Sequence, residues 1–277
     1  MVLESLVNPK SAQRYYLLLL LVGFLYATIG LFFSYWIFRD QAGLVMVLFV
    51  VLAAVPLFYA TMKREEEQVI NTLKEKDILK SHAKVVRFFM FFFVGLTFGF
   101  AFWYVVLPFA DSVNIFQIQL KTISSLNQQV TGNVAQVALF SKIFLNNLKV
   151  MVFSIVFSFI FGSGAIFILT WNGSVIGAAV GSFINLYLFK IPSQDLLVYF
   201  QAIVMSVLRY FVHGIPEITA YFTAGLAGGI LSASIIRGRF KENFEKILLD
   251  FSDLTIISIL LLLIAGLLEV FVTPIFF

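Results

Sequence analysis

Apolar runs that are long enough to cross a membrane restrict the fold of this chain more than any other feature. A helix that crosses the hydrocarbon of a bilayer needs about 20 mainly apolar residues, because lipid offers no partner to a free backbone amide or carbonyl. Five runs meet this requirement: residues 15–38, 43–62, 85–107, 148–171 and 255–273. Hydrophobic residues make up 61% of the chain and charged residues only 12%, whereas soluble domains contain about 25% charged residues. The sequence therefore predicts a multi-pass integral membrane protein.

Three further apolar runs lie before the last of these five and are harder to assign. They are residues 174–189, 196–212 and 218–236. The first two are short, and the third begins directly after Pro216 and Glu217. Together with the longer runs they predict an all-α polytopic membrane helix bundle of about six to eight helices, with one broken or re-entrant element.

Basic residues predict which side of the membrane each connection occupies, because Lys and Arg are enriched in cytoplasmic segments. They precede the first run, occur seven times in residues 63–87 and recur before the last run: Lys10, Arg14, Lys63, Arg64, Lys74, Lys76, Lys80, Lys84, Arg87, Arg237, Arg239, Lys241 and Lys246. We therefore expect these segments and the amino terminus to lie in the cytoplasm, with the protein in the cell membrane. Residues 108–147, with Lys121 and Lys142 as their only basic residues, are expected outside.

This orientation limits the number of crossings in the second half of the chain. Between an outer Asn147 and an inner Arg237 the chain must cross an odd number of times, yet four apolar runs lie between them. Residues 196–212 form a short run that ends at H-G-I-P-E (213–217), where Pro216 lacks a backbone donor. We therefore predict the broken or re-entrant element at this point. Irregular backbone at membrane depth is tolerated only where protein or a polar cavity surrounds it.

Two of the connections have a helical periodicity of their own. In residues 63–87 apolar and basic residues recur at helical spacing, which predicts a solvated amphipathic extension of the second and third spans. In residues 108–147 apolar residues recur every three to five positions among Gln, Ser, Thr and Asn. This second pattern is typical of an amphipathic helix that lies along the outer interface.

Three G-x-x-x-G patterns predict close packing of helices: Gly95/Gly99, Gly177/Gly181 and Gly225/Gly229. Small residues at this spacing share one helix face and let a second backbone approach. Packing within the chain is the commoner use of such faces. Since three of them exceed what one short bundle obviously needs, we also predict a homodimer, the commonest symmetric assembly. Membrane lipids and a second membrane protein are further expected partners.

Polar residues at membrane depth are the candidate binding residues, because burying a charge there is costly. Arg209, His213 and Glu217 recur at i, i+4 and i+8, nearly on one helix face. Glu217 then either pairs with Arg209 or His213, or stays protonated. The predicted binding set comprises Asn146, Asn147, Asn172, Arg209, His213, Glu217 and Glu269. A cluster that only fixes helix packing is the alternative interpretation.

The sequence lacks the residue sets of the common enzyme classes. It contains no cysteine and two histidines, and His82 lies in the charged connection, far in sequence from His213. A catalytic zinc ion needs three protein ligands, and no serine is marked as an activated nucleophile. No phosphate-binding glycine motif is visible. We therefore expect no enzymatic activity, no metal and no cofactor, and the net charge of +4 is too small to indicate nucleic-acid binding.

Several motifs occur in an order that is similar to one membrane-protein family. They are F-L-N-N-L-K-V (144–150), the two glycines of F-G-S-G (161–164), W-N-G-S-V-I-G (171–177), H-G-I-P-E-I-T-A-Y-F-T-A-G-L-A-G (213–228) and L-L-E-V-F-V-T-P (267–274). In this order they resemble the stage II sporulation protein M family of bacterial and archaeal membrane proteins. The likeness covers about half of the chain, from residue 144 to residue 274, and the first three spans match only in hydropathy.

The resemblance implies an integral membrane protein without established enzymatic activity. Members from spore-forming bacteria look like the scaffold of a peptidoglycan-degrading engulfment complex, and most others have no assigned role. The resemblance carries over, as positions of unknown role, Asn146, Asn147, Asn172, Gly173, His213, Gly214, Glu217 and Glu269. We therefore expect a membrane scaffold or assembly subunit that acts through helix–helix and lipid contacts. The alternative is a transporter or permease-like protein with a polar site at residues 213–217, although no inverted repeat is visible.

The resemblance also divides the single membrane domain, residues 1–277. Residues 1–107 form a less family-like helical portion, residues 108–143 the outer amphipathic segment, and residues 144–277 the family-like core.

Single cysteines at Gln68 and Gln128 test the predicted orientation, since the chain has no cysteine of its own. Because residues 63–87 contain seven basic residues and residues 108–147 contain two, we expect a membrane-impermeant maleimide to label the two positions from opposite sides of the membrane. Labelling of both from the same side would exclude this orientation and the crossing argument that depends on it.

Overall fold

The protein is a bundle of α-helices, seen here in a computed structural model that describes residues 16–72, 74–130, 136–162, 164–191 and 195–276. Lys10 and Arg14 lie outside these residues. Within the described residues seven helices are long and apolar enough to cross a membrane, and no strand occurs. The predicted all-α bundle of about six to eight helices is confirmed.

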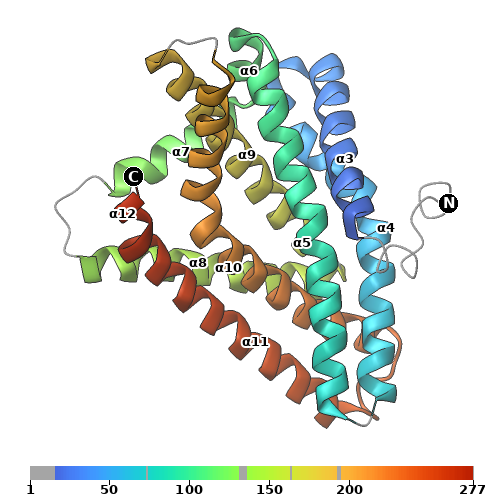
Figure 1. Ribbon diagram of the computed structural model, residues 1–277. Coiled ribbons are helices and arrows are strands. Elements are labelled where there is room, and N and C mark those ends of the chain that lie inside the picture. The colour runs from blue at the N-terminus through green and yellow to red at the C-terminus, as the bar shows by residue number, and fades with distance from the viewer. Residues whose placement is uncertain (1–15, 73, 131–135, 163, 192–194, 277) are drawn as a thin grey trace.

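The helices follow one another with short connections, and Figure 1 shows α3, α4 and α5 side by side while α8 lies across the bundle and α11 runs obliquely. The elements are α3 (Tyr16–Ile37), η1 (Arg39–Gln41), α4 (Ala42–Asn71), α5 (Glu75–Val106), α6 (Phe109–Ile115), α7 (Gln117–Val130), α8 (Gln136–Phe161), α9 (Ala165–Lys190), α10 (Leu196–Ile236), α11 (Phe244–Leu267), η2 (Leu268–Val272) and α12 (Thr273–Phe276). The short element η2 is a π-helical turn that joins α11 to α12.

One of the five longest runs is divided between two helices. The predicted span 148–171 is wrong, because α8 ends at Phe161 and α9 begins at Ala165. Gly162 has a φ of 70°, a left-handed conformation that glycine adopts without the steric cost of a Cβ atom. A Cβ atom on Gly164 would lie 2.2 Å from the carbonyl oxygen of Phe157. These two glycines therefore allow a tight reversal in the middle of an apolar run.

The predicted break at residues 213–217 is not an interruption of the helix. α10 continues for 41 residues with Pro216 inside it, so the runs 196–212 and 218–236 belong to one helix and neither is re-entrant. Figure 1 shows that its axis changes direction along its course, and a proline inside a helix is a known cause of such a bend. The four apolar runs after Asn147, which itself lies in α8, therefore form three helical segments: the rest of α8, α9 and α10.

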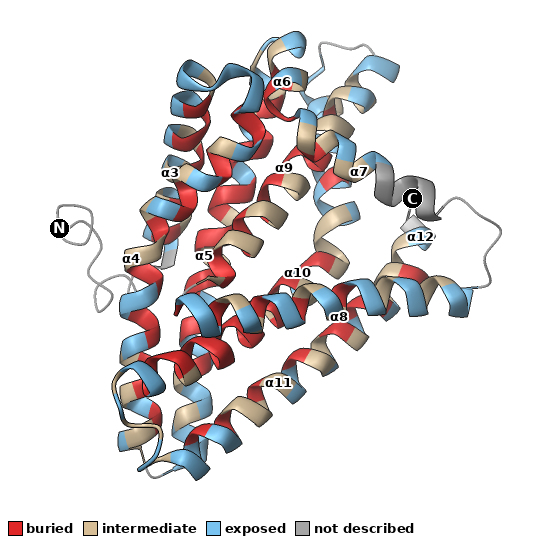
Figure 2. Ribbon diagram, turned by 180° about the vertical axis from the view of Figure 1, so that it is seen from behind, coloured by how far each residue is buried: buried red, intermediate tan, exposed pale blue. Residues whose placement is uncertain are grey.

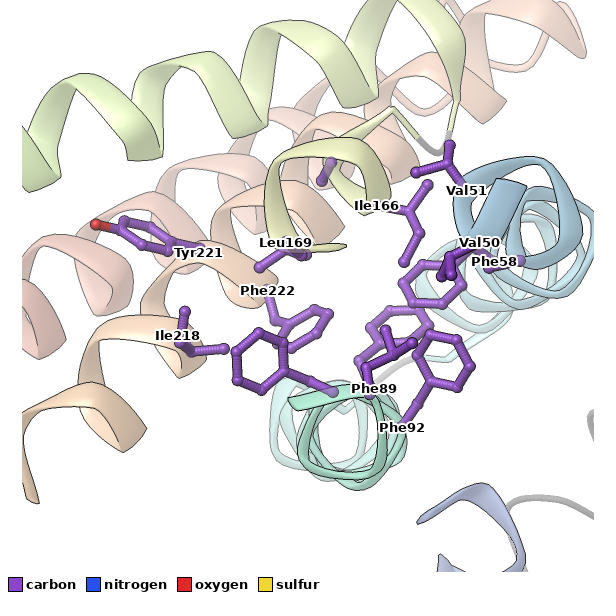
Figure 3. Packing of buried hydrophobic residues seen from close by; sticks show 14 of the residues in the cluster. Val50, Val51, Phe58, Phe89, Phe92, Ile166, Leu169, Ile218, Tyr221 and Phe222 are labelled. Atoms are coloured by element: carbon purple, nitrogen blue, oxygen red, sulfur yellow. The ribbon is translucent and has the colours of Figure 1, made fainter. Parts of the chain in front are cut away.

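Aromatic side chains of α4, α5 and α10 form the centre of the core (Figure 3). Phe58 stacks on Phe89 with ring centroids 4.1 Å apart, and Phe89 stacks on Phe222 at 5.4 Å. Phe92 meets Phe58 edge to face at 5.7 Å. Figure 2 shows that α5 is buried along much of its length, whereas α8 and α11 each expose one side. These stacked rings fix the second half of α10 against α4 and α5.

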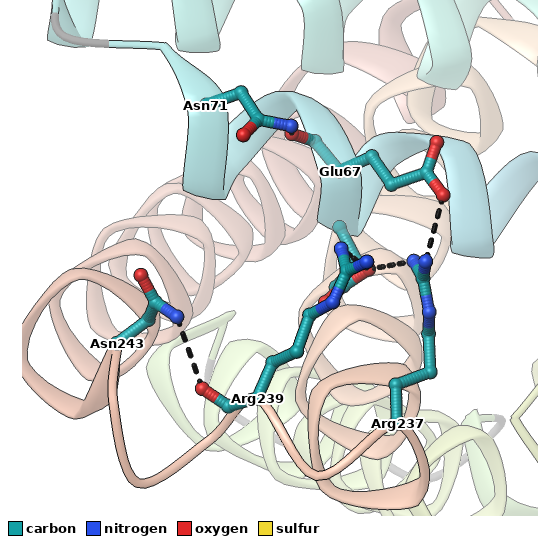
Figure 4. A network of polar contacts seen from close by, with 6 residues as sticks. Glu67, Asn71, Arg237, Arg239 and Asn243 are labelled. Atoms are coloured by element: carbon teal, nitrogen blue, oxygen red, sulfur yellow. Dashed lines mark hydrogen bonds and ion pairs between the residues drawn. The ribbon is translucent and has the colours of Figure 1, made fainter.

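Ion pairs fasten the end of the bundle at which α4 and α10 finish (Figure 4). Arg237 contacts Glu66 and donates a hydrogen bond of 2.8 Å to Glu67, and Arg239 lies 3.9 Å from Glu66. Glu66 is fully buried. We call this region, residues 65–67, 82 and 237–250, the charged end.

A second cluster at the charged end joins three helices. His82 of α5 contacts Glu65 of α4 at 3.0 Å through Nδ1 and Asp250 of α11 at 2.7 Å through Nε2. The predicted helical extensions of the second and third spans are present, but they are not simply solvated, since Glu65 and His82 are buried. The charged side chains of residues 63–87 therefore also connect α4, α5 and α11 to one another.

All three G-x-x-x-G faces are occupied inside the chain. A Cβ atom on Gly95 would lie 2.1 Å from the carbonyl oxygen of Leu20, and one on Gly177 would lie 2.7 Å from Phe100. A Cβ atom on Gly225 would lie 2.6 Å from Ala165. These faces therefore bring α5, α9 and α10 close to their neighbours, and they no longer argue for a homodimer.

Alanine at Gly95 and at Gly214 should have opposite effects on thermal stability. Gly95→Ala forces α3 and α5 apart, and overpacking of this kind costs about 1–3 kcal/mol. Gly214 lies in α10, and a Cβ atom added there would meet nothing within 4 Å beyond its chain neighbours and the backbone of its own helix. Alanine in a helix interior is favoured over glycine by about 0.5–1 kcal/mol. We expect the midpoint of thermal unfolding in detergent to fall for Gly95→Ala and to stay or rise for Gly214→Ala. An equal midpoint for Gly95→Ala and the wild type would contradict this packing of α3 on α5.

Candidate functional site

A polar cavity of about 200 Å³ lies between α8, α9, α10 and η2. α8 contributes one face, in which residues recur at three- and four-residue steps: Leu139, Lys142, Ile143, Asn146, Asn147 and Val150. Asn172 comes from α9, Glu217 and Tyr221 from α10, and Glu269 from η2. Four segments that are distant in sequence therefore meet around one polar space.

Five of the seven predicted binding residues line this cavity. They are Asn146, Asn147, Asn172, Glu217 and Glu269. The prediction was based on the free-energy cost of burying polar groups in lipid. In the structure these five side chains reduce this cost because they surround a common polar cavity. Lys142 and Tyr221 also line it. The sequence could have indicated both residues: Lys142 lies four positions before Asn146, and Tyr221 lies four positions after Glu217, so each pair shares one helix face.

The hydrogen bonds around the cavity leave several polar atoms for a ligand or for water. Tyr221 donates a hydrogen bond of 2.8 Å to Oε1 of Glu217. Nδ2 of Asn172 donates to the carbonyl oxygen of Ile168 at 2.8 Å, which leaves its side-chain oxygen as an acceptor. Nδ2 of Asn147 is buried and has no hydrogen-bond partner among the described residues. A buried polar group without a partner is rare in folded proteins, so the amide N–H groups of Asn147 are donors to which a water molecule or an oxygen of a ligand in the cavity could bind.

Glu269 lies in the π-helical turn η2. Such turns are rare inside α-helices and are frequent at functional sites. Thr273 donates a hydrogen bond of 3.1 Å to the carbonyl oxygen of Leu268, and Nδ1 of His213 lies 3.2 Å from the Thr273 hydroxyl. Because the Thr273 proton is directed to Leu268, Nδ1 of His213 is the donor to Thr273. His213 therefore ties α10 to the turn that carries Glu269, and it does not line the cavity itself.

Arg209 lies in a different place from the other predicted residues. Its guanidinium carbon is 5.5 Å from the ring centroid of Phe183 and 6.0 Å from that of Tyr210, and it lines a second cavity between α7, α9 and α10. The predicted single face fails because eight residues of a helix exceed two turns by about 80°. Glu217 and Arg209 therefore point into different cavities.

The chemistry of the first cavity favours a positively charged or hydrogen-bonding group. It combines two carboxyl groups, three carboxamides, one phenol and one lysine. Within the described part of the chain no group of three or more His, Cys, Asp or Glu residues could hold a metal ion. The structure therefore presents acceptors for a small cation without the ligand set of a structural metal site.

Glu217→Leu should lower the stability of the fold by leaving the Tyr221 hydroxyl without its acceptor. Tyr221 is fully buried, and a buried polar group that loses its partner costs on the order of 1–3 kcal/mol. We expect the midpoint of thermal unfolding to fall for Glu217→Leu, to stay near the wild-type value for Glu217→Gln, and to be partly recovered in Glu217→Leu/Tyr221→Phe. A single Glu217→Leu variant as stable as the wild type would show that this hydrogen bond does not support the fold.

Comparisons with known proteins agree with the membrane architecture. The family model for Stage II sporulation protein M matches residues 23–274, so it includes the first three spans as well as the motifs after residue 144. An uncharacterized protein from Methanocaldococcus jannaschii is 28% identical over 194 residues, which cover 69% of this chain and 93% of that relative. No solved structure matches the chain. The chain belongs to the stage II sporulation protein M family and is an integral membrane protein.

Proposed function

We propose that this protein binds a small monovalent cation in the cavity between α8, α9, α10 and η2 and acts as a transporter or permease-like protein. The observation that supports this most directly is the meeting of Glu217 and Glu269, carried by two different helical segments, in one polar space. Ionisable residues at membrane depth commonly mark ion or substrate pathways.

The balance of charge in the cavity favours one positive charge. With both carboxylates ionised and Lys142 protonated, two negative charges face one positive charge, which leaves one negative charge uncompensated. An uncompensated charge away from water is costly. A bound monovalent cation, or a proton on one of the carboxyl groups, removes this cost. Cation binding and proton release at this site are therefore expected to be linked.

The backbone around the cavity is suited to movement. α10 contains Pro216 one residue before Glu217, and Glu269 lies in a π-helical turn. Transporters often place ion sites where membrane helices depart from regular geometry. A cation held between the two carboxylates links α10 to η2, so its arrival or departure changes the force between these two segments.

A scaffold or assembly role is the second candidate, and it follows from the properties of the family. The observation that favours it is the exposed apolar side of α8, which includes Val152, Phe153, Val156, Phe159 and Ile160. Such a surface can contact lipid or a second membrane protein. A homodimer stays a proposal, and its interface would use a surface of this kind because the G-x-x-x-G faces are occupied inside the chain.

Thermal unfolding of the purified protein in detergent tests cation binding. The buffer is based on N-methylglucamine, an organic cation much larger than the ions under test, and Na⁺, K⁺, ammonium and methylammonium are added separately. We expect at least one of them to raise the unfolding midpoint with a saturable dependence on concentration. At a concentration 100 times the dissociation constant, binding stabilises the folded state by about 2.7 kcal/mol.

Matched variants assign the effect to the cavity. Glu217→Gln and Glu269→Gln keep the size of each side chain and remove its charge, and we expect either one to abolish the cation-dependent shift. Glu245→Gln removes a carboxylate at an exposed position in the first turn of α11 and should leave the shift unchanged. Flux of the same cation into proteoliposomes then separates transport from binding alone. A shift that is equal in the wild type and in both cavity variants would exclude this site.

A further inference from the structure

The second cavity, between α7, α9 and α10, has the opposite chemistry to the first. It has a volume of about 530 Å³ and is lined by two basic residues, Lys190 and Arg209, with the phenols of Tyr187 and Tyr210 beside them. None of the described residues that line it is acidic. Lys190 and Arg209 come from different helices, α9 and α10, and both are exposed. The site therefore gathers two positive charges and two phenol hydroxyls around a space open to the surroundings.

The guanidinium of Arg209 is held in place by aromatic rings. It lies over Phe183 at 5.5 Å and near Tyr210 at 6.0 Å, distances at which a cation is attracted to the face of a ring. Contacts of this kind engage the face of the guanidinium, and its edge also donates a hydrogen bond to the Tyr210 hydroxyl. Arginine carries five N–H donors in all. The fork of N–H donors on arginine matches two oxygens of a phosphate group.

The lengths of α9 and α10 show where along the bundle the basic residues of this cavity lie. α10 has 41 residues and is therefore about 60 Å long, about twice the thickness of the hydrocarbon layer. Arg209 lies 13 residues after Leu196, the first residue of α10, and so about 20 Å along the helix. Lys190 is the last residue of α9. The two charges therefore lie towards one end of the bundle, the end opposite to Arg237.

Apart from Ser182, the remaining walls of the cavity are apolar. Leu186 is 57% exposed and lines the cavity together with Phe183 and Ile123. A free inorganic anion would leave this apolar surface uncovered. An amphiphile with a phosphate group and hydrocarbon chains would satisfy both kinds of wall.

We propose that this cavity binds an anionic phospholipid, with its phosphate between Arg209 and Lys190 and its acyl chains along Leu186 and Phe183. The site is separate from the cation cavity, and the proposal does not depend on the proposed transport function. The bound lipid bridges α9 and α10, so it supports the first half of α10, which Figure 2 shows with much of its surface exposed.

Lipid-dependent thermal unfolding of the full chain tests this proposal. Phosphatidylglycerol or phosphatidylcholine with identical acyl chains is added to the delipidated protein in detergent, and native mass spectrometry counts the lipids that stay bound. We expect phosphatidylglycerol to raise the unfolding midpoint and to be retained, and phosphatidylcholine to do so far less. The apparent affinity for phosphatidylglycerol should fall about tenfold or more in Arg209→Gln, since a hydrogen bond to a charged group contributes about 1.5–3 kcal/mol.

Control variants separate a lost site from a lost fold. Lys190→Gln should weaken binding in the same direction, and Arg209→Lys, which keeps the charge, should recover part of it. Lys80→Gln removes an exposed charge near the charged end and should leave lipid binding unchanged. If Arg209→Gln does not fold, Lys190→Gln and Arg209→Lys still report on the site.

Two results would overturn the proposal. The first is an equal shift with both lipids, or a shift that the Arg209 and Lys190 variants retain in full. The second is stabilisation by millimolar inorganic phosphate that matches and displaces phosphatidylglycerol, because the cavity would then bind a soluble anion and not a lipid.

Discussion

The cost of placing a charge or an unpaired polar group in hydrocarbon governs how this protein is built. The chain contains few charged residues for its length, and 12% of its residues are Asp, Glu, Lys or Arg. Many of the described charged residues gather in three places: the charged end, the cavity with Glu217 and Glu269, and the cavity with Lys190 and Arg209. The three places differ in how their charges are balanced. The charged end uses opposite charges from the protein, whereas each cavity holds an excess of one sign.

α10 connects all three places. Its first half carries Arg209, its middle carries Glu217 and its end is followed by Arg237. The stacked rings of Phe58, Phe89 and Phe222 hold its second half against α4 and α5. Its first half has fewer buried residues and lies beyond the bend (Figures 1 and 2). The part of α10 that is packed in the core and the part with fewer buried residues therefore meet near Glu217.

The sequence predicted which residues would need a polar environment, but not how they would be grouped. Long apolar runs identified most of the long helices, and the cost of buried polar groups pointed to Asn146, Asn147 and Asn172, which line the first cavity. Local spacing was misleading for Arg209, because eight residues of a helix exceed two turns by about 80°, and this offset decides which neighbouring helix a side chain faces. The reversal at Gly162 was also missed, since an apolar composition continues through it. The continuity of α10 across Pro216 was missed because a proline weakens a helix locally, while packing on both sides maintains it.

The two histidines of the chain act on the same final helical segment. Nε2 of His82 contacts Asp250 near the start of α11, at the charged end, and Nδ1 of His213 contacts Thr273, just after the turn that carries Glu269. An ionised carboxylate only accepts hydrogen bonds, so His82, which contacts Glu65 with its other nitrogen, donates from both nitrogens and carries a positive charge. α11 and η2 are therefore tied to α5 at one end and to α10 at the other. Glu269 lies close to the second of these contacts, so the hydrogen bond of His213 to Thr273 holds the turn that carries Glu269 against α10, while the charged end holds the start of α11.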